Sequence, residues 1–280
     1  MPLNTDLVGK EYPESTYEVT AEAIEKYARA TNDENERYLS GENVVASPIF
    51  PIVPAFRYLM EAGMDPELEA DLLRLVHGEE EHILHKPLRE GDVLTIHPVI
   101  ESIERKDTGE TFTINVGERD RQGDLVAEIR ATSFIRGTGS GKRPSSQTAE
   151  PSTREIVHED TTKVDEDQTH RYAEASGDQN PIHLDENTAR MAGLPGIILH
   201  GMCTMAMATK GAVNGLSGGD PTRVKRVAVR FSRPVLPGQE LTTRFWKEGS
   251  GNGTTVYGFE TYNPDGRAVI KNASVEIADA

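Results

Sequence analysis

The chain repeats itself, and this internal repeat constrains its fold more than any other feature of the sequence. Residues 27–35, YARATNDEN, match residues 172–180, YAEASGDQN, at five of nine positions. Further along, KPLREGDVL (86–94) matches RPVLPGQEL (233–241) through one shared proline, glycine and leucine, so the spacing drifts only from 145 to 147 residues. A spacing kept over so long a stretch predicts two structural units of the same plan, each of about 130 residues.

A segment of small and polar residues separates the two copies. Residues 137–155, GTGSGKRPSSQTAEPSTRE, contain almost no apolar side chain and are typical of a linker. We therefore expect an N-terminal unit at residues 1–136 and a C-terminal unit at residues 156–280.

The hydrophobic pattern gives both units the same order of elements. A short helix is followed by a turn, by an apolar helix, and then by three or four strands with alternating polar and apolar residues. Helices first and strands after predict an α+β fold, in which an antiparallel sheet carries a long helix on one face. The expected helices are residues 20–31 and 51–63 in the first unit, and residues 165–176, 186–192 (with Asp185 as N-cap) and 201–215 in the second.

Charge and composition disfavour some classes of function. With 46 acidic and 30 basic residues the net charge is −16, so phosphate-rich nucleic acids and anionic lipids are poor partners. The sequence has no run of about 18 apolar residues, so we expect no membrane span. Its start lacks the basic and apolar regions of a secretory signal, and its single cysteine, Cys203, suits a reducing compartment. These features predict a cytoplasmic protein, in which a few Arg and Lys residues can still bind a small anion.

Three short patterns resemble catalytic motifs but lack the residues that the chemistry needs. The stretch GTGSGKR (137–143) would be a phosphate-binding loop only with Gly at 136 and Ser or Thr at 143, where the chain has Arg136 and Arg143. Cys203 lies in an apolar helix, as a small core residue does. Ser176 lacks the G-x-S-x-G elbow of serine hydrolases.

A histidine cluster in the first half is a further pattern. His77, His82 and His85 lie near three glutamates at residues 79–81, and imidazoles with carboxylates can bind a metal ion. The repeat places this segment on a strand, and the matching positions of the second half carry no such ligands. We therefore expect exposed strand residues here and no metal site.

The strongest candidate for a site is ASGDQNPIHLD (175–185), which puts Asp178, Asn180 and His183 within six positions of one another. Asp and Asn are common in turns, where their side chains bond their own backbone, so a plain loop is one interpretation. A catalytic acid–base pair is the other.

A comparison of the two copies favours the catalytic interpretation. The first half keeps Asp33 and Asn35 but has Tyr38 where the second half has His183. A carboxylate and an imidazole therefore occur together in one half only, as expected of a duplicated enzyme with one retired site.

A glycine at the start of the second apolar helix adds a possible third group. The stretch GLPGIILHGM (193–202) contains His200 and Gly201 directly before that helix. Gly201 offers a backbone N–H without a side chain in front of it, at the positive end of the helix dipole, and such a donor binds an oxyanion. A carboxylate, an imidazole and this donor suit proton transfer next to a carbonyl group.

The segment YAEASGDQNPIHLDENTARMAGLPGIILHGM (172–202) resembles the hydratase signature of the MaoC-like dehydratases, in particular the (R)-specific enoyl-CoA hydratase group. The shared pattern is S-G-D-x-N-P-x-H with a terminal H-G-M, and the resemblance extends over roughly residues 165–245. The first half is similar to the degenerate N-terminal half of the two-hot-dog members. The resemblance implies a double hot-dog fold, with two antiparallel sheets, each wrapped around a long central helix, packed as a pseudo-dimer.

The resemblance also implies roles for individual residues. Asp178 and His183 match the catalytic dyad, Asn180 matches a position that orients the site, and Gly201 matches the oxyanion donor. The residues of this segment that we expect to bind substrate are Ser176, Gly196, Ile197 and His200.

A basic stretch in the second half is a candidate for contact with the phosphates of CoA. Arg223 and Arg230 are the residues that we assign to substrate binding there. The same stretch equally fits the solvated face of a strand; its other basic residues are Lys225, Arg226 and Arg233.

The activity that the resemblance implies is (R)-specific hydration of a trans-2-enoyl-CoA to an (R)-3-hydroxyacyl-CoA, or the reverse dehydration, by an Asp/His dyad that activates water. We expect no metal ion and no organic cofactor. The expected partner is an acyl-CoA thioester or an acyl-ACP thioester, and the sequence is compatible with a homodimer. Three alternatives stay open: a 3-hydroxyacyl-ACP dehydratase of fatty-acid synthesis, a thioesterase, and a non-catalytic subunit that binds acyl thioesters.

Overall fold

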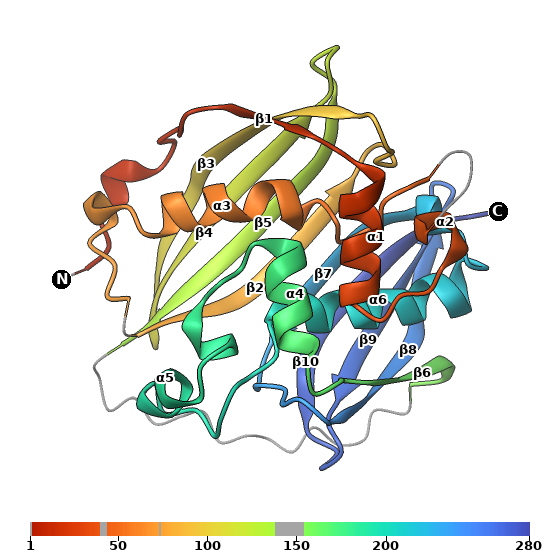
Figure 1. Ribbon diagram of the computed structural model, residues 1–280. Coiled ribbons are helices and arrows are strands. Elements are labelled where there is room, and N and C mark those ends of the chain that lie inside the picture. Colours follow the sequence, from red (N-terminus) through yellow and green to blue (C-terminus); the bar gives the residue numbers. More distant parts are fainter. Residues whose placement is uncertain (1, 40–43, 73, 138–153) are drawn as a thin grey trace.

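The computed structural model describes residues 2–39, 44–72, 74–137 and 154–280 (Figure 1). Within these residues the chain builds one arrangement of helices and strands twice, as the repeat predicts. The expected linker, residues 137–155, lies almost wholly outside the described residues, so the boundary between the two units stays a prediction.

The first half begins with short elements, continues through helices α1 to α3 and ends in long strands. The Thr20 hydroxyl accepts the Ala23 N–H at 3.1 Å and fixes the start of α1. The two helices expected in this half are confirmed to within a residue at each end. The elements are η1 (Thr5–Leu7), β1 (Ser15–Glu18), α1 (Ala21–Ala30), α2 (Glu36–Leu39), α3 (Ile52–Gly63), η2 (Pro66–Leu68), β2 (Leu75–Leu84), β3 (Val93–Lys106), β4 (Gly109–Arg119) and β5 (Leu125–Arg136).

The second half follows the same order, with the short 3-10 helix η3 added before its long apolar helix. The Asp185 carboxylate accepts the Thr188 N–H at 2.7 Å, which confirms the predicted N-cap. The three helices expected here are present. The elements are β6 (Ile156–Lys163), α4 (Gln168–Ser176), η3 (Pro181–His183), α5 (Glu186–Met191), α6 (Gly201–Leu216), η4 (Pro221–Arg223), β7 (Val224–Phe231), β8 (Glu240–Gly251), β9 (Thr254–Tyr262) and β10 (Ala268–Ala278).

The described strands form one ten-stranded sheet, in the order β1-β3-β4-β5-β2-β7-β10-β9-β8-β6. Strand β2 pairs with β7 across the junction of the halves, with Glu79 opposite Arg230 and Glu80 opposite Val229. The expectation of two separate sheets is therefore corrected to one continuous antiparallel sheet (Figure 1). The physical reason is that β2 and β7 would otherwise be open edges, and their unpaired backbone groups satisfy each other when the halves meet.

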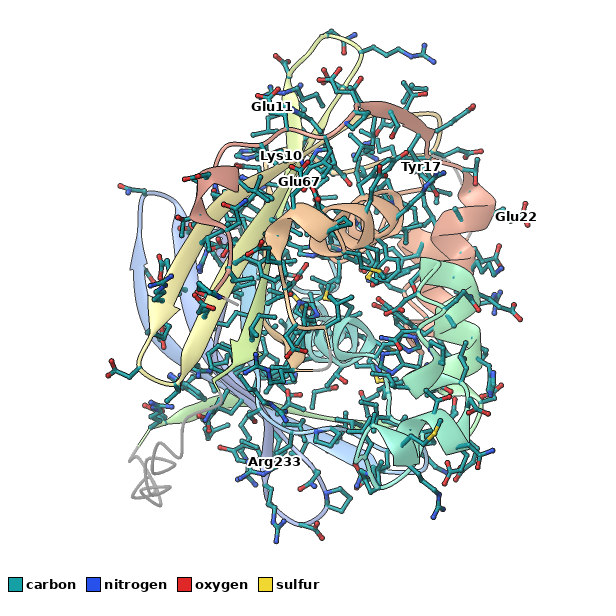
Figure 2. The ribbon with its side chains drawn as sticks, turned by 90° about the vertical axis from the view of Figure 1, so that its left-hand side faces the viewer. Lys10, Glu11, Tyr17, Glu22, Glu67 and Arg233 are labelled. Carbon is teal, nitrogen blue, oxygen red and sulfur yellow. The ribbon has the colours of Figure 1, made fainter. Side chains whose placement is uncertain are left out.

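The long helices lie on one face of this sheet. Figure 2 looks nearly along α3 and α6 and shows the sheet on one side of them and α1 and α4 on the other. Helix α6 has eleven of its sixteen residues buried, as expected of a helix that is apolar nearly all round, and Cys203 is one of them. Among the described helices, none is both long enough and apolar enough to cross a membrane.

Glycines let α6 lie close to strand β6. A Cβ atom at Gly211 would stand 2.8 Å from the Cβ of Asp160. Ordinary van der Waals contact needs more room than this, so the approach of the helix to the strand depends on the missing side chain.

We predict that Gly211→Ala lowers the free energy of unfolding by about 1 kcal/mol, because overpacking costs about 2 kcal/mol and alanine, the better helix former, returns about 1 kcal/mol. Urea unfolding measures the difference. Gly249→Ala is the matched control, since a Cβ there meets no atom within 4 Å. If Gly211→Ala is as stable as the wild type, the close packing of α6 on β6 is wrong.

Candidate active site

Helix α4 ends in a tight turn that carries the candidate residues. Gly177 takes the left-handed conformation (φ 82°) that commonly ends a helix, and its N–H donates to the Ala173 carbonyl. The Ser176 hydroxyl donates to the Tyr172 carbonyl at 2.8 Å and accepts the Asp178 N–H at 3.2 Å. Ser176, which we expected to bind substrate, is therefore buried and bonded within the turn.

Asp178 and Asn180 build the next part of the turn through their side chains. The Asp178 carboxylate accepts the Asn180 N–H at 3.1 Å, and the Asn180 side-chain oxygen accepts the Ile182 N–H at 3.3 Å. Asn180 thereby caps the short helix η3, which has Pro181 at its start. The loop interpretation is thus correct in that Asp178 and Asn180 bond the backbone of the turn. The same turn also fixes the position of His183, which follows it in η3.

The His183 ring is held in one orientation by a backbone carbonyl. Its Nδ1 lies 2.8 Å from the Ile198 oxygen, and because a carbonyl can only accept, Nδ1 carries the proton. In the neutral ring the lone pair is therefore on Nε2. His183 is 7% exposed, and donor atoms of Asp178, His183 and His200 all lie within 4.8 Å of one another. The structure thus brings the expected carboxylate and imidazole together.

His200 lies directly behind His183. The two rings stack with centroids 3.8 Å apart and planes at 28°. The His200 Nε2–H donates to the backbone carbonyl of Asp178 at 3.1 Å, and its Nδ1 has no hydrogen-bond partner among the described residues. With 1% of its surface exposed, His200 supports the turn and the His183 ring from the interior, where we had expected it to bind substrate.

Helix α6 begins at Gly201, next to these three side chains. The first N–H groups of a helix have no partner within it, and they carry the positive end of its dipole. A Cβ at Gly201 would lie 3.2 Å from the ring of Phe231, so the glycine also lets this ring pack against the start of the helix. The donor that the sequence predicts is one residue after His200, whose ring stacks on His183 and bonds to the Asp178 carbonyl.

Burial moves the pKa values of the carboxyl and imidazole groups in opposite directions. It raises the pKa of Asp178 above its ordinary value, against the charges of His183 and His77 and a backbone hydrogen bond. Burial lowers the pKa of His183, opposed by the charge of Asp178 and by a backbone hydrogen bond. Burial and the charge of His183 lower the pKa of His200 to about 3, so that ring is neutral at pH 7. Opposite shifts in adjacent groups are typical of acid–base sites.

The cluster has donor atoms for a metal ion but not the geometry. Nδ1 of His183 and Nε2 of His200 are both bonded to carbonyl oxygens. A tetrahedral site needs the remaining lone pairs to converge on one point about 2 Å from each nitrogen. Because the ring planes are nearly parallel, at 28°, with centroids 3.8 Å apart, no single point at that distance lies in both planes, as the in-plane lone pairs would require. The three residues fit an acid–base site and do not fit a metal centre.

Gly196 and Ile197, two further residues expected to bind substrate, contact helix α5. The Ile197 N–H donates to the Glu186 carboxylate at 3.1 Å. A Cβ at Gly196 would lie 3.3 Å from the same carboxylate, so the glycine lies close to Glu186 as well. Both residues therefore hold the loop before α6 in place through Glu186.

The basic stretch of the second half is largely used within the protein. The Arg223 guanidinium donates to the carbonyl groups of Ala278 and Ser217. Arg230 is 53% exposed and pairs with Glu79 only at 3.7 Å, so it is the freer of the two candidates for a phosphate contact. The other three basic side chains, Lys225, Arg226 and Arg233, also bond to protein groups. Arg233 lies at the lower end of the molecule in Figure 2.

The first half keeps the turn but lacks the imidazole. Asp33 accepts the Asn35 N–H at 3.2 Å, as Asp178 accepts that of Asn180. Burial raises the pKa of Asp33 to about 6, opposed by this hydrogen bond. Tyr38, in place of the imidazole, is fully buried, and its hydroxyl has no partner in the part of the chain that the structure describes.

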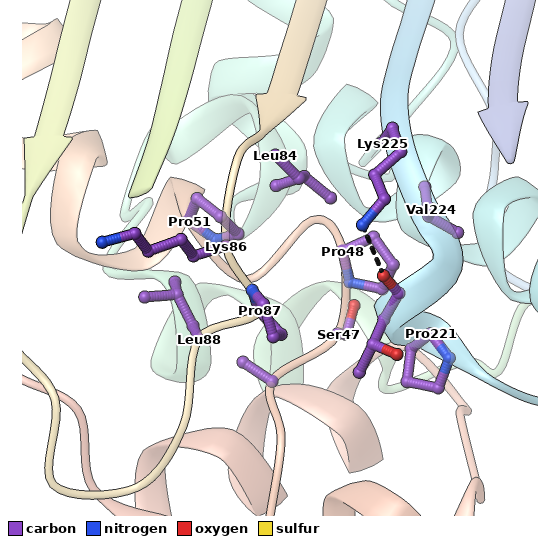
Figure 3. A pocket seen from close by; sticks show the side chains of 12 residues that line it. Ser47, Pro48, Pro51, Leu84, Lys86, Pro87, Leu88, Pro221, Val224 and Lys225 are labelled. Carbon is purple, nitrogen blue, oxygen red and sulfur yellow. Dashed lines mark hydrogen bonds between the residues drawn. The ribbon is translucent and has the colours of Figure 1, made fainter. Parts of the chain in front are cut away.

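A small hollow lies apart from the cluster, between the loop before α3, the end of β2 and the start of β7 (Figure 3). Much of its lining is rigid and apolar, from Pro48, Pro51, Pro87 and Pro221. Lys225 at its edge is already bonded to a backbone carbonyl. The other lysine of the lining, Lys86, is bonded to Asp120 and Asp124, so the hollow offers no acid–base pair and is not the candidate site.

The expectation of exposed residues in the histidine cluster is wrong for two of its members. Glu80 is 1% exposed and His82 is 0% exposed. Strand β2 lies in the middle of the joined sheet, so its alternate side chains face the interior. His77 is 37% exposed, and its ring lies 5.0 Å from that of Phe231, beside the candidate site. No local pattern signals this position, because it depends on the pairing of β2 with β7.

Comparisons with known proteins agree with this geometry. A family model described as "MaoC like domain" matches residues 147–265, and one described as "FAS1-like, dehydratase domain region" matches residues 6–129. The 3-hydroxyacyl-thioester dehydratase Y of Mycobacterium tuberculosis is 32% identical over 214 residues, which are 72% of this chain and 72% of that protein. The peroxisomal enoyl-CoA hydratase 2 of Arabidopsis thaliana is 28% identical, over 88% of both chains.

Some relatives are much longer proteins. The peroxisomal multifunctional enzyme type 2 of Mus musculus is 32% identical over 83% of this chain, and this chain spans 32% of that enzyme. The chain spans 43% of the Drosophila melanogaster enzyme of the same name. Several of these names include "peroxisomal", so the cytoplasmic location stays a prediction.

Solved structures share the whole fold. A MaoC-like dehydratase from Phytophthora capsici superposes with a TM-score of 0.84 at 26% identity, over 99% of this chain and 98% of that one. A Mycobacterium tuberculosis protein described as a double hot-dog superposes with a TM-score of 0.67 at 11% identity, over 97% and 96% of the two chains. The fold is thus a double hot-dog. On the sequence matches above, the chain belongs to the MaoC-like dehydratase family.

We predict that His200 makes stability depend on pH. Its pKa of about 3 in the folded state is below the ordinary value of 6.5, so only the unfolded chain gains this proton as the pH falls below 6.5. The stability contributed by the neutral ring is present above pH 6.5 and is lost progressively down to about pH 3. Between pH 6.5 and 5 the loss is about 2 kcal/mol. Urea unfolding at both pH values should show a smaller loss in His200→Gln; an identical loss in both proteins would contradict the buried, neutral ring.

Proposed function

We propose that the protein hydrates a trans-2-enoyl-CoA to the (R)-3-hydroxyacyl-CoA, or catalyses the reverse dehydration. The observation that carries the proposal is the convergence of Asp178 and His183 beside the N-terminus of α6. The names of two relatives support the reaction class, since one is a 3-hydroxyacyl-thioester dehydratase and the other an enoyl-CoA hydratase 2.

The Asp178–His183 pair holds and activates the water molecule. Nε2 of His183 is the free nitrogen of that ring, because Nδ1–H is bonded to the Ile198 carbonyl. The water bonds both to this nitrogen and to the Asp178 carboxylate, and it attacks C3 of the enoyl group. As the C3–O bond forms, one O–H bond of the water breaks and its proton passes to the pair. General acid–base help of this kind is worth about 10²–10⁴ in rate.

The start of α6 stabilises the charge that develops on the thioester oxygen. The electrons of the C2–C3 double bond move toward the carbonyl group when water adds at C3, and an enolate-like oxygen results. The N–H of Gly201 donates to this oxygen, and the helix dipole favours the negative charge. C2 then takes a proton from the pair. The product carries the hydroxyl group at C3 and the new hydrogen at C2.

The position of the pair also determines the stereochemistry. Because the same pair activates the water and returns the proton, water and proton add to the same face of the double bond. A single enantiomer follows, and the family resemblance makes it the (R) form. Arg230, which is exposed, is the basic residue that we assign to the phosphates of CoA.

We predict that Asp178→Asn and His183→Gln each lower kcat/KM for hydration of crotonyl-CoA by about 10²-fold or more, because each removes one member of the acid–base pair. Loss of the conjugated enoyl absorbance measures the rate. Asp33→Asn is the matched control, since Asp33 occupies the same turn in the half without the imidazole, and its turnover should stay near the wild-type value.

Four outcomes would overturn the assignment. Asp178→Asn that keeps more than about a tenth of the activity removes Asp178 from the chemistry, given the expected factor. An equal loss in Asp33→Asn places activity in the first half. Release of free thiol without loss of the double bond identifies a thioesterase. A pure protein without activity indicates a binding subunit. If an acyl-ACP substrate is preferred over its CoA counterpart, the reaction stays the same and only the carrier changes.

A further inference from the structure

Strand β2 carries a chain of buried charged groups that the proposed mechanism does not use. Glu80 is 1% exposed, and each of its oxygens meets one imidazole. Oε2 lies 2.8 Å from Nε2 of His77, and Oε1 lies 3.1 Å from Nε2 of His82. These two imidazoles are the ion-pair partners of Glu80 among the described residues. A buried carboxylate needs such partners, because an unpaired charge in the interior is strongly destabilising.

The two imidazoles have different surroundings. His82 is completely buried, and its Nδ1 has no partner among the described residues. His77 is 37% exposed, so its charged form keeps part of its hydration. Burial lowers the pKa of His77, but the hydrogen bond and charge of Glu80, followed by the charge of Asp178, raise it above its ordinary value. The proton that compensates Glu80 is therefore best held by His77.

His77 lies beside the candidate site of the other half. Its ring is 5.0 Å from the ring of Phe231. A Cβ at Gly201 would in turn lie 3.2 Å from that phenyl ring. Strand β2, strand β7 and the start of α6 thus meet at one place, and the charges of His77 and Asp178 act on each other there.

The other titratable groups around Asp178 differ in charge. They are His183 from η3, His200 from the start of α6 and Tyr172 from α4. The charge of His183 lowers the pKa of Asp178 more than that of His77 does, but burial lowers the pKa of His183 itself. His200 is neutral because its pKa is lowered to about 3, and burial raises the pKa of Tyr172, so its hydroxyl is also neutral. On the side of His77, the neighbouring charged pair of Glu79 and Arg230 is largely exposed and therefore well screened.

We propose that His77, held by the buried Glu80 carboxylate and packed against Phe231, is a positioning residue that the first half contributes to the active site, where its positive charge favours the carboxylate form of Asp178. His77 acts through Asp178 and does not touch the reacting atoms. The meaning of this effect for catalysis rests on the proposed function, whereas the effect itself on Asp178 does not.

The direct test is a titration of the Asp178 carboxyl carbon by ¹³C NMR, with its resonance assigned by its absence from Asp178→Asn. In His77→Gln the midpoint should rise by about half a pH unit or more, because an opposite charge nearby lowers a carboxyl pKa. Glu80→Gln should raise it in the same direction, since His77 then loses its proton more easily. His77→Lys restores a positive charge and should recover much of the shift. The acid limb of kcat/KM for crotonyl-CoA should move with these midpoints.

His85→Gln is the matched control. His85 pairs with Glu128 at 2.9 Å at the other end of β2 and is 40% exposed, so its loss should leave the Asp178 midpoint unchanged. An unchanged midpoint in both His77→Gln and Glu80→Gln overturns the inference, as does an equal rise in His77→Gln and His77→Lys. If the wild type lacks hydratase activity, the proposed function fails, but the NMR titration still decides whether His77 controls Asp178.

Discussion

Two hydrogen bonds to backbone carbonyls hold the candidate site together. The His183 Nδ1–H donates to Ile198, and the His200 Nε2–H donates to Asp178. Each bond runs from one segment to the other, so the turn after α4 and the loop before α6 are fixed against each other in both directions. The bonds also select one tautomer for each neutral ring, and they leave the lone pair of His183 on Nε2. The acid–base character of the site and its place at the start of α6 follow from this cross-connection.

The junction of the two halves extends the site beyond the half that carries the dyad. Because β2 pairs with β7, the first half places the His77 ring next to Phe231 and within electrostatic reach of Asp178. The first half has the buried Tyr38 in its own turn, and its strand β2 pairs with β7 beside the candidate site.

Much of the fold could be predicted from the sequence, because repeats and hydrophobic periods are local signals. These local signals were sufficient to predict the order of the helices and the N-cap at Asp185. The joined sheet could not be predicted in this way, since it depends on which strand edges meet, and the burial of Glu80 and His82 follows from that meeting. The turn around Asp178 could be predicted from the short segment 175–185 alone. The stacking of His200 on the dyad imidazole was not, because it arises from packing between separate segments.

The central claim is that one acid–base pair on one face of the acyl chain adds both parts of water. The most direct measurement is hydration of crotonyl-CoA in D₂O, followed by analysis of the product at C2 and C3. The account predicts one deuterium at C2, on the same face as the hydroxyl group at C3, in a single (R) enantiomer. A product with deuterium on the opposite face, or a mixture of both enantiomers, would contradict it.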